Sequence, residues 1–283
     1  MALKNTKITF FDLASVYPDR RSLSLWCWTT RLVLNFKGLG YTTQFVEFPD
    51  IEPTLKPLGI PPTATKADGS PLFTVPAIID ATDPTKPPVC VSDSQEILLY
   101  LEKMYPDPLR PLIPSTTQNT GTYVPAPALY MLVKQFVLSN FMPYILPLVI
   151  EDMVPIIPPR AFEFATKAIV AAKGEGHDFL TAHFVGKEGS PEKEAYWKKL
   201  EAGFGIMALI LESGEKIRAD SSVSGGAGEF FMGHQVTFAD FSLLAPMIMI
   251  RFASERGWER VSKWHGGRWE RYWKALEEYI VVA

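Results

Sequence analysis

The stretch FTVPAIIDATDPTKPPVCVSDSQEILLYLEKMYP, from Phe73 to Pro106, decides the fold. It predicts a strand entered through Pro76, a second short strand after a proline-containing turn, and then a helix. The helix has an acidic N-cap, Asp93, with Glu96 three residues later, and then an apolar stripe. Each feature alone is an ordinary structural one, since a proline can open a strand and an aspartate can cap a helix. Their meaning depends on the chain around them.

Upstream of this stretch the sequence predicts an alternation of strands and helices. An apolar run over residues 7–13 is strand-like, and residues 24–37 carry an apolar face at four-residue steps, which is typical of a helix. Residues 42–48 alternate like a strand, and residues 49–69 are rich in proline and glycine, with room for a short helix. The predicted order is therefore β-α-β-(α)-β-β-α.

Downstream the composition changes to proline, serine, threonine, asparagine and glycine, which indicates a linker. The rest of the chain reads as helical, with helices over residues 128–140 and 160–173 and from Ser190, Thr237 and Arg268 onward. We predict an α/β domain over residues 1–108, a linker over 109–127 and an all-helical domain over 128–283. A loop over residues 213–233 has the character of an insertion.

The composition limits the class of protein. The chain has 283 residues, 47% of them hydrophobic and 21% charged, and a net charge of −3, which is typical of a soluble globular protein. No basic stripe with interleaved aromatic residues points to nucleic acid, and two cysteines exclude a multi-disulfide scaffold. The apolar segment 141–159 is interrupted by acids and prolines, and the N-terminus lacks a secretory pattern. We therefore expect a cytoplasmic protein without a membrane span. We also expect no metal site, because the four histidines lack ligand spacing.

Three motifs, taken together, resemble the cytosolic glutathione transferases. They are TVPAI at residues 74–78, the Asp-Ser helix start at residues 93–94 with its Tyr-Leu and Tyr-Pro, and the Thr-x-Ala-Asp cap at residues 237–240. The resemblance covers nearly the whole chain. Several pieces are similar, more narrowly, to the fungal-specific class A (FuA) and the bacterial glutathione-dependent β-etherases: WTTRLVLNFKGLGY, VEFPDIEP, PPTATKADGSP and VSDSQEILLYLE.

The resemblance implies a fold and a glutathione site. The N-terminal domain would be thioredoxin-like, with a cis bond before Pro76, and the helical domain would supply a hydrophobic acceptor site. Val75 would pair its backbone with the cysteinyl part of glutathione, like an added strand, and Asp93 and Ser94 would hold the γ-glutamyl end at a helix N-terminus. The glycyl carboxylate has no assigned partner, and a homodimer is implied.

The helix start SLSLWCW, residues 22–28, contains the residue expected to activate glutathione. A cysteine thiol has a pKa of about 8.5, which falls near a helix N-terminus or another positive group. By resemblance, the active residue lies seven positions before the Arg that begins the apolar run, which selects Ser24, with Ser22 in reserve. Ser24 also suits a plain N-cap. Cys27 occupies the second, more buried position of a Cys-x-x-Cys pattern and is expected to belong to the core.

The sequence leaves three functions open. The first is a serine-type glutathione transferase acting on hydrophobic, aromatic electrophiles in detoxification. The second is a glutathione-dependent β-etherase of lignin-type aryl ethers, and the third is a ligandin-like binder of phenolics, such as wood-derived ones. Trp26, Phe136 and Asn140 are candidates for the acceptor site, although aromatic residues at helical spacing usually belong to the core.

Overall fold

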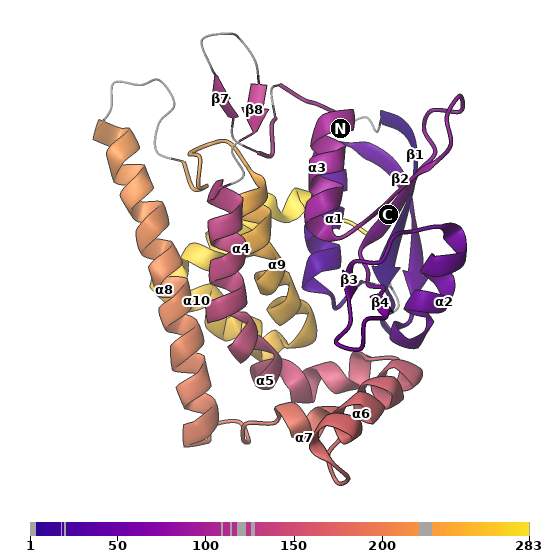
Figure 1. Ribbon diagram of the computed structural model, residues 1–283. Helices are drawn as coiled ribbons and strands as arrows, with labels where there is room; N and C mark the ends of the chain where they lie inside the picture. Colours follow the sequence, from indigo (N-terminus) through magenta and orange to yellow (C-terminus); the bar gives the residue numbers. More distant parts are fainter. Residues whose placement is uncertain are drawn as a thin grey trace. The chain divides into compact units, whose positions relative to one another are not determined.

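The computed structural model describes residues 4–17, 19, 21–108, 110–113, 115–117, 123–125, 128–220 and 228–282. The chain forms two compact units (Figure 1). Unit 1 combines Met1–Pro106 with Asp152–Ala182 and Tyr279–Ala283, and unit 2 combines Asp107–Glu151 with His183–Glu278. A helical stretch from the second half of the chain therefore packs with the N-terminal residues. The predicted boundaries at residues 108 and 128 stay predictions.

Unit 1 is built on a four-stranded mixed sheet in the order β2-β1-β5-β6. Its strands are β1 (Lys4–Leu13), β2 (Leu39–Val46), β5 (Ala77–Asp80) and β6 (Val89–Ser92). β1 pairs parallel with β2 and antiparallel with β5, and β5 pairs antiparallel with β6. A parallel β1–β2 pair needs a helical crossover, which α1 (Leu25–Phe36) provides.

Three helices and several short elements complete the N-terminal part of unit 1. They are α1, α2 (Ile51–Leu55), α3 (Ser94–Met104), the 3₁₀ turns η1 (Phe48–Asp50) and η2 (Lys56–Leu58), and the hairpin of β3 (Ala64–Thr65) and β4 (Pro71–Leu72). α1 packs on α3 and on the sheet, and ten of its twelve residues are buried. The predicted order of the helices and of the four strands of the main sheet is confirmed, whereas the β3–β4 hairpin was not predicted. The peptide bond before Pro76 is cis.

The later part of unit 1 consists of η3 (Val154–Ile156), α6 (Pro159–Lys173) and α7 (Phe179–His183), of which α7 ends at the boundary of the unit. The C-terminal residues close the unit, because the Asn35 side chain on α1 donates to the backbone oxygens of Tyr279 and Val281 at 2.7 and 2.9 Å.

Unit 2 is a helical bundle around α9. Its helices are α4 (Ala128–Asn140), most of α5 (Met142–Met153), α8 (Pro191–Asp220), α9 (Phe238–Ala253) and α10 (Glu255–Leu276), with η4 (Glu277–Tyr279) at its edge and a small ladder of β7 (Ser115–Thr117) and β8 (Tyr123–Pro125). The predicted cap of α9 is confirmed, since the Asp240 carboxylate accepts from the Thr237 backbone N–H at 2.8 Å. The long buried run of α9 confirms its prediction as core.

Some predicted elements differ from the structure. The second strand begins at Leu39 rather than residue 42, because Gly38 at φ 61° turns the chain directly out of α1. The segment 141–159 contains α5, in spite of Pro147 inside it. The stretch α10 consists of two helices joined by a kink at residues 264–267, where three residues have positive φ, so the predicted start of the last helix at Arg268 agrees with the structure and the helix before the kink was missed.

The expected loop over residues 213–233 is also partly wrong, because α8 is helical through Asp220. Residues 221–227 of that loop, and nine of the nineteen residues of the predicted linker, lie outside the described residues, while β7 and β8 lie within the linker.

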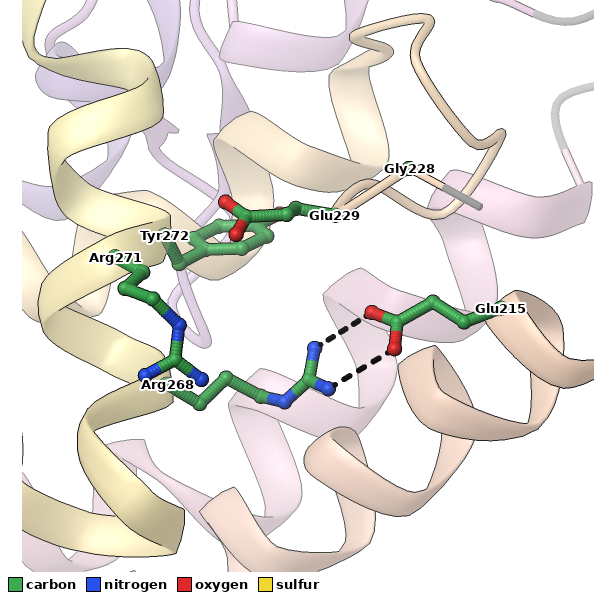
Figure 2. A pocket seen from close by; sticks show the side chains of 6 residues that line it. All are labelled: Glu215, Gly228, Glu229, Arg268, Arg271 and Tyr272. Carbon is green, nitrogen blue, oxygen red and sulfur yellow. Dashed lines mark hydrogen bonds and ion pairs between the residues drawn. The ribbon is translucent and has the colours of Figure 1, made fainter. Parts of the chain in front are cut away.

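A cavity of about 260 Å³ lies beside the C-terminal half of α10 in unit 2 (Figure 2). Its wall is strongly polar, and the Arg268 guanidinium there binds both carboxylate oxygens of Glu215 at 2.9 and 3.2 Å. The Tyr272 hydroxyl, at its base, donates to Asp240 at 2.8 Å.

The predicted combination of a thioredoxin-like N-terminal fold with a helical C-terminal part is confirmed. Among the described helices, no single one is both long and apolar enough to cross a membrane, and only α4 and the adjoining 142–156 stretch, bent by 55°, meet that test as a pair.

Candidate functional site

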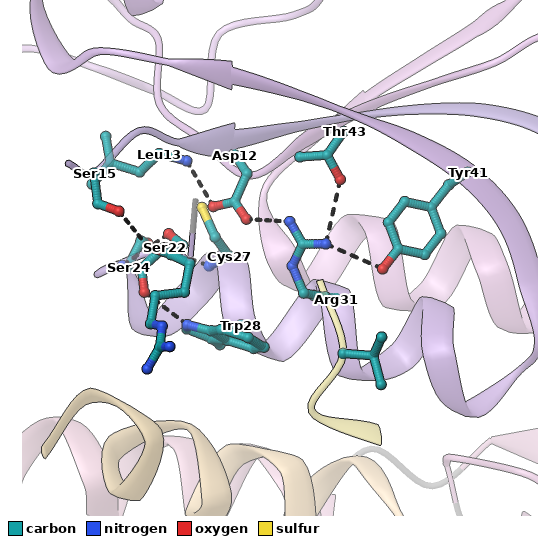
Figure 3. Close-up of polar contacts among 12 residues, drawn as sticks. Asp12, Leu13, Ser15, Ser22, Ser24, Cys27, Trp28, Arg31, Tyr41 and Thr43 are labelled. Carbon is teal, nitrogen blue, oxygen red and sulfur yellow. Dashed lines mark hydrogen bonds and ion pairs between the residues drawn. The ribbon is translucent and has the colours of Figure 1, made fainter. Parts of the chain in front are cut away.

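The start of α1 places Ser24 at an accessible helix N-terminus (Figure 3). Ser24 is the N-cap, with an extended backbone, and its Oγ accepts a hydrogen bond from the Cys27 N–H at 3.3 Å. The first turn of α1 contains no acidic residue. The partial positive charge of the helix N-terminus is therefore not compensated there, and an anion beside Ser24 would be stabilised.

Ser22 has a different environment. Its side chain is buried, with 2% of the residue exposed, and its Oγ accepts from the Ser24 N–H at 3.1 Å. Its backbone oxygen accepts from the Trp28 indole N–H at 2.8 Å. Ser22 thus shapes the turn before α1, whereas Ser24 is only half-buried and can be reached.

Cys27 is fully buried one turn into α1. Burial, and then the negative charge of Asp12, raise the pKa of its thiol well above the ordinary value. A thiol in that state is a poor nucleophile, which agrees with its prediction as a core residue.

A buried ion pair between α1 and β1 was not predicted from the sequence. The Arg31 guanidinium donates to the Asp12 carboxylate at 2.7 Å, and both side chains are fully shielded from solvent. Arg31 also donates to the Tyr41 and Thr43 hydroxyls at 3.2 and 3.3 Å (Figure 3). The other carboxylate oxygen of Asp12 accepts from the Leu13 N–H at 2.6 Å, where β1 ends. The pair and its hydrogen bonds join β1, α1 and β2 at the middle of α1.

The sheet register gathers the other predicted glutathione-site residues at one edge. Phe11 pairs with Ala77, and Ala77 pairs with Ser92. The end of β1, the Val75–Pro76 bond just before β5 and the start of α3 just after β6 therefore lie at the same edge of the sheet. Val75 lies two residues before the first paired residue of β5, Ala77, and so outside the β1–β5 strand pairing.

Asp93 and Ser94 begin α3. Asp93 has φ 76°, an uncommon backbone conformation for a residue other than glycine, and its carboxylate caps the helix by accepting from the Gln95 N–H at 2.8 Å. Ser94 is buried at 5% exposure, and its hydroxyl has no hydrogen-bond partner among the described side chains and backbone. A strained residue beside an unpaired hydroxyl at a helix N-terminus suits a bound anion.

An apolar cavity of about 150 Å³ lies within unit 1, and Leu23, just before α1, is part of its wall. Leu13, Ala14 and Leu23, which directly precedes Ser24 in the chain, line it together with residues from the second half of the chain, among them Met153, Ala161 and Phe179. No pattern in the sequence links these two groups, which is why the sequence did not predict the cavity.

The predicted acceptor residues lie elsewhere. Trp26 is half-buried on α1, and none of Trp26, Phe136 and Asn140 lines this cavity. On α4, the Phe136 ring packs edge-to-face on Phe141 with centroids 5.7 Å apart, and the Asn140 amide donates to the Phe136 backbone oxygen at 3.0 Å. These contacts are typical of core and helix residues, so the role of the three in acceptor binding stays a prediction.

Other parts of the described chain offer less. The polar cavity of Figure 2 contains none of the predicted site residues, and its Arg268 is already paired. Within the described ranges, no three His, Cys, Asp or Glu side chains are gathered so that they could hold a metal ion.

Comparison with known proteins gives family matches in both halves of the chain. Residues 23–104 match the family described as glutathione S-transferase, N-terminal domain, and residues 128–279 match glutathione S-transferase, C-terminal domain. The chain is 26% identical over 285 residues to a glutathione S-transferase-like protein, ustS, of Aspergillus flavus, covering 98% of this chain and 92% of that one.

Two solved structures are similar over almost the whole chain. Glutathione transferase GSTFuA3 of Phanerochaete chrysosporium is 30% identical with a TM-score of 0.77, and the match covers 100% of both chains. CsGST63524 of Ceriporiopsis subvermispora, solved in complex with glutathione, is 30% identical with a TM-score of 0.75 over 98% of both chains. The resemblance to the fungal FuA proteins is confirmed, and this chain belongs to the glutathione S-transferase family.

Proposed function

We propose that this glutathione transferase is of the serine type, that Ser24 activates the thiol of glutathione, and that the acceptor is a hydrophobic aromatic electrophile. The observation that carries the proposal is the position of Ser24, half-buried at the N-terminus of α1 and adjacent in the chain to Leu23 of the apolar cavity. No other candidate combines a hydroxyl, a helix N-terminus and a neighbouring apolar wall.

The chemistry follows from these neighbours. The glutathione thiol releases its proton to solvent, and the thiolate is stabilised by the Ser24 hydroxyl and by the positive end of α1. The sulfur attacks an electrophilic carbon, a C–S bond forms, and the leaving group departs with the bonding electrons. Cys27 does not replace Ser24 as a nucleophile, because burial raises the pKa of its thiol.

The edge of the sheet supplies the rest of the glutathione site in this proposal. The Val75 backbone lies ahead of the β5 ladder and can pair with an extended peptide. Asp93 carries a negative charge that suits the ammonium group of the γ-glutamyl end, and the Ser94 hydroxyl with the α3 N-terminus suits its carboxylate.

Two related functions use the same site. Ether cleavage differs only in the leaving group, a phenolate, and turnover of a β-aryl ether that depends on glutathione would favour it. A ligandin-like binder would hold phenolics tightly without conjugating them. The wall of the apolar cavity suits all three, since its side chains offer burial of apolar area rather than hydrogen bonds.

The proposal includes a cytoplasmic homodimer, as the family resemblance implies. Unit 2 exposes large apolar side chains, among them Leu132 on α4 and Leu209 on α8, at 70% and 64% exposure. Exposed apolar residues of this kind are common at subunit interfaces, and sedimentation analysis measures the state directly.

The test is Ser24→Ala, with Ser22→Ala as the matched control. A hydrogen bond to a charged group is worth about 1.5–3 kcal/mol, so we expect kcat/KM with 1-chloro-2,4-dinitrobenzene to fall roughly 10- to 150-fold. The ultraviolet absorbance of the bound thiolate should titrate at higher pH, while the Kd of glutathione changes little. Ser22→Ala should retain the thiolate titration. If Ser24→Ala keeps full turnover and an unshifted titration, Ser24 is not the activating residue.

A further inference from the structure

The apolar cavity is assembled from two stretches of the chain that are far apart in sequence. Leu13, Ala14, Leu23 and Phe48 come from the thioredoxin-like part, and the remaining wall comes from the end of α5, from α6 and from Phe179 on α7. Both stretches belong to unit 1. The segment 153–179 therefore supplies one part of the wall of a pocket whose other part includes Leu23, the residue before Ser24.

The size of this cavity matches one aromatic ring. A dry cavity of about 150 Å³ lined by aliphatic and aromatic side chains is known to hold benzene, and this cavity has about the same volume. Two alanines of α6, Ala161 and Ala165, face it together with the rings of Phe48 and Phe179. Small residues beside aromatic ones in the same wall leave room for a flat ring.

Specific contacts fix the covering segment in place. The Arg160 guanidinium, at the start of α6, binds both carboxylate oxygens of Asp50 at 2.9 Å, with Glu47 at 3.8 Å. The Val16 N–H donates to the Ile156 backbone oxygen at 3.2 Å, and the rings of Phe48 and Phe164 lie 5.8 Å apart. Arg160 thus ties α6 to the turn that carries Phe48.

Phe179 is fixed in a similar way. Its backbone N–H donates to the Thr166 hydroxyl at 3.2 Å, and its ring packs edge-to-face on Phe162 with centroids 6.3 Å apart. The aromatic wall on α7 is therefore held by α6, and a movement of α6 would move both.

We propose that α6 and α7 form the cover that selects the acceptor, that the pocket beneath admits a single aromatic ring, and that Arg160 is the positioning residue that holds the cover. This inference rests on the proposed function, and it adds the acceptor size and the segment that sets it.

The size is tested with isothiocyanates, to which the glutathione sulfur adds at carbon while a proton goes to nitrogen and no group leaves. Ala165→Phe fills the pocket, and Ala168→Phe is the matched control, since Ala168 is exposed on the same helix and lies outside the wall. We expect Ala165→Phe to raise KM for benzyl isothiocyanate roughly tenfold or more, to raise KM for the smaller allyl isothiocyanate less, and to leave the Kd of glutathione unchanged. Ala168→Phe should change none of the three.

A second variant enlarges the pocket instead. Phe179→Ala should admit naphthylmethyl isothiocyanate, which we expect the wild type to use poorly. This variant decides the question if Ala165→Phe does not fold.

Arg160 is tested by Arg160→Gln, with Lys167→Gln as control, because Lys167 is an exposed cation on α6 that pairs with Glu163 of the same helix. Exposed ion pairs have modest effects, so we expect KM for benzyl isothiocyanate to rise about two- to fivefold with kcat unchanged. The difference from wild type should vanish at high salt.

The outcomes separate this inference from the proposed function. An unchanged benzyl KM in Ala165→Phe and unchanged selectivity in Phe179→Ala overturn the cover, although conjugation by Ser24 would stand. If no isothiocyanate is conjugated, calorimetric binding of toluene still tests the pocket: Ala165→Phe should abolish it and Ala168→Phe should not. The proposed function itself fails only if 1-chloro-2,4-dinitrobenzene is not conjugated either. Toluene binding that is equal in all three proteins also overturns the inference.

Discussion

Replacement of Arg31 by methionine should destabilise the protein more than any single surface change, because it leaves the Asp12 carboxylate without its partner. The two side chains are fully buried and joined at 2.7 Å. Removal of one partner from such a pair costs about 3–5 kcal/mol, mostly because the remaining charge stays buried and uncompensated. Hydrogen bonds from Arg31 to Tyr41 and Thr43 are lost as well, so we expect a value in the upper half of that range.

A double-mutant cycle isolates the reason for this loss. Asp12→Asn removes the charge and keeps the shape, so the double variant Asp12→Asn with Arg31→Met no longer buries an unpaired carboxylate. We expect its loss of unfolding free energy to be smaller than the sum of the single losses by about 2 kcal/mol, within the range seen for directly contacting residues.

Urea unfolding followed by tryptophan fluorescence measures the cycle, since Trp28 lies on α1 beside this pair. A loss below about 1 kcal/mol for Arg31→Met, or additive single losses, would contradict the reasoning, because either result means that the Asp12 charge is solvated or neutral without Arg31. Glutathione binding by the Asp12→Asn variant then reports whether the start of α1 has kept its position.

Two further predictions concern titratable groups. Burial opposes ionisation of Asp80, but hydrogen bonds, including those from Tyr105 and Tyr100 at 2.6 and 2.9 Å, hold the pKa of its carboxyl below the ordinary 3.8. The free energy of unfolding contributed by the ionised Asp80 carboxylate is fully present above pH 3.8 and is lost as the pH falls through the lowered pKa. In Asp80→Asn the urea concentration at the unfolding midpoint should therefore fall less steeply at acid pH than in the wild type. An unchanged dependence on pH refutes the assignment. Burial also raises the pKa of the Cys27 thiol well above normal, so in the native protein a thiol reagent should modify Cys90 first. Cys27→Ala should have the kcat of the wild type, and a large loss of turnover would instead place Cys27 in the mechanism.

Much of the fold was predictable because it depends on local interactions. The Ser24 N-cap, the Asp93 N-cap and the Thr237–Asp240 capping box each join residues two or three positions apart, and such spacings are visible in a sequence. Strands and helices with a clear apolar period were located to within a few residues. α5 was missed because Pro147 counts against a helix locally, whereas packing in the folded protein stabilises it.

The sequence alone determined the glutathione transferase resemblance and most of the order of elements, since these follow from short motifs and their spacing, and the resemblance in turn selected Ser24 as the predicted activating residue. Only the tertiary structure decided the rest: Ser22 is buried and Ser24 accessible, Asp12 and Arg31 are paired, and Arg160 reaches Asp50 across 110 positions of the chain. The physical reason is that a charge pair or an apolar cavity depends on which distant segments pack together. A linear pattern carries that information weakly, while burial and distance in the folded chain give it directly.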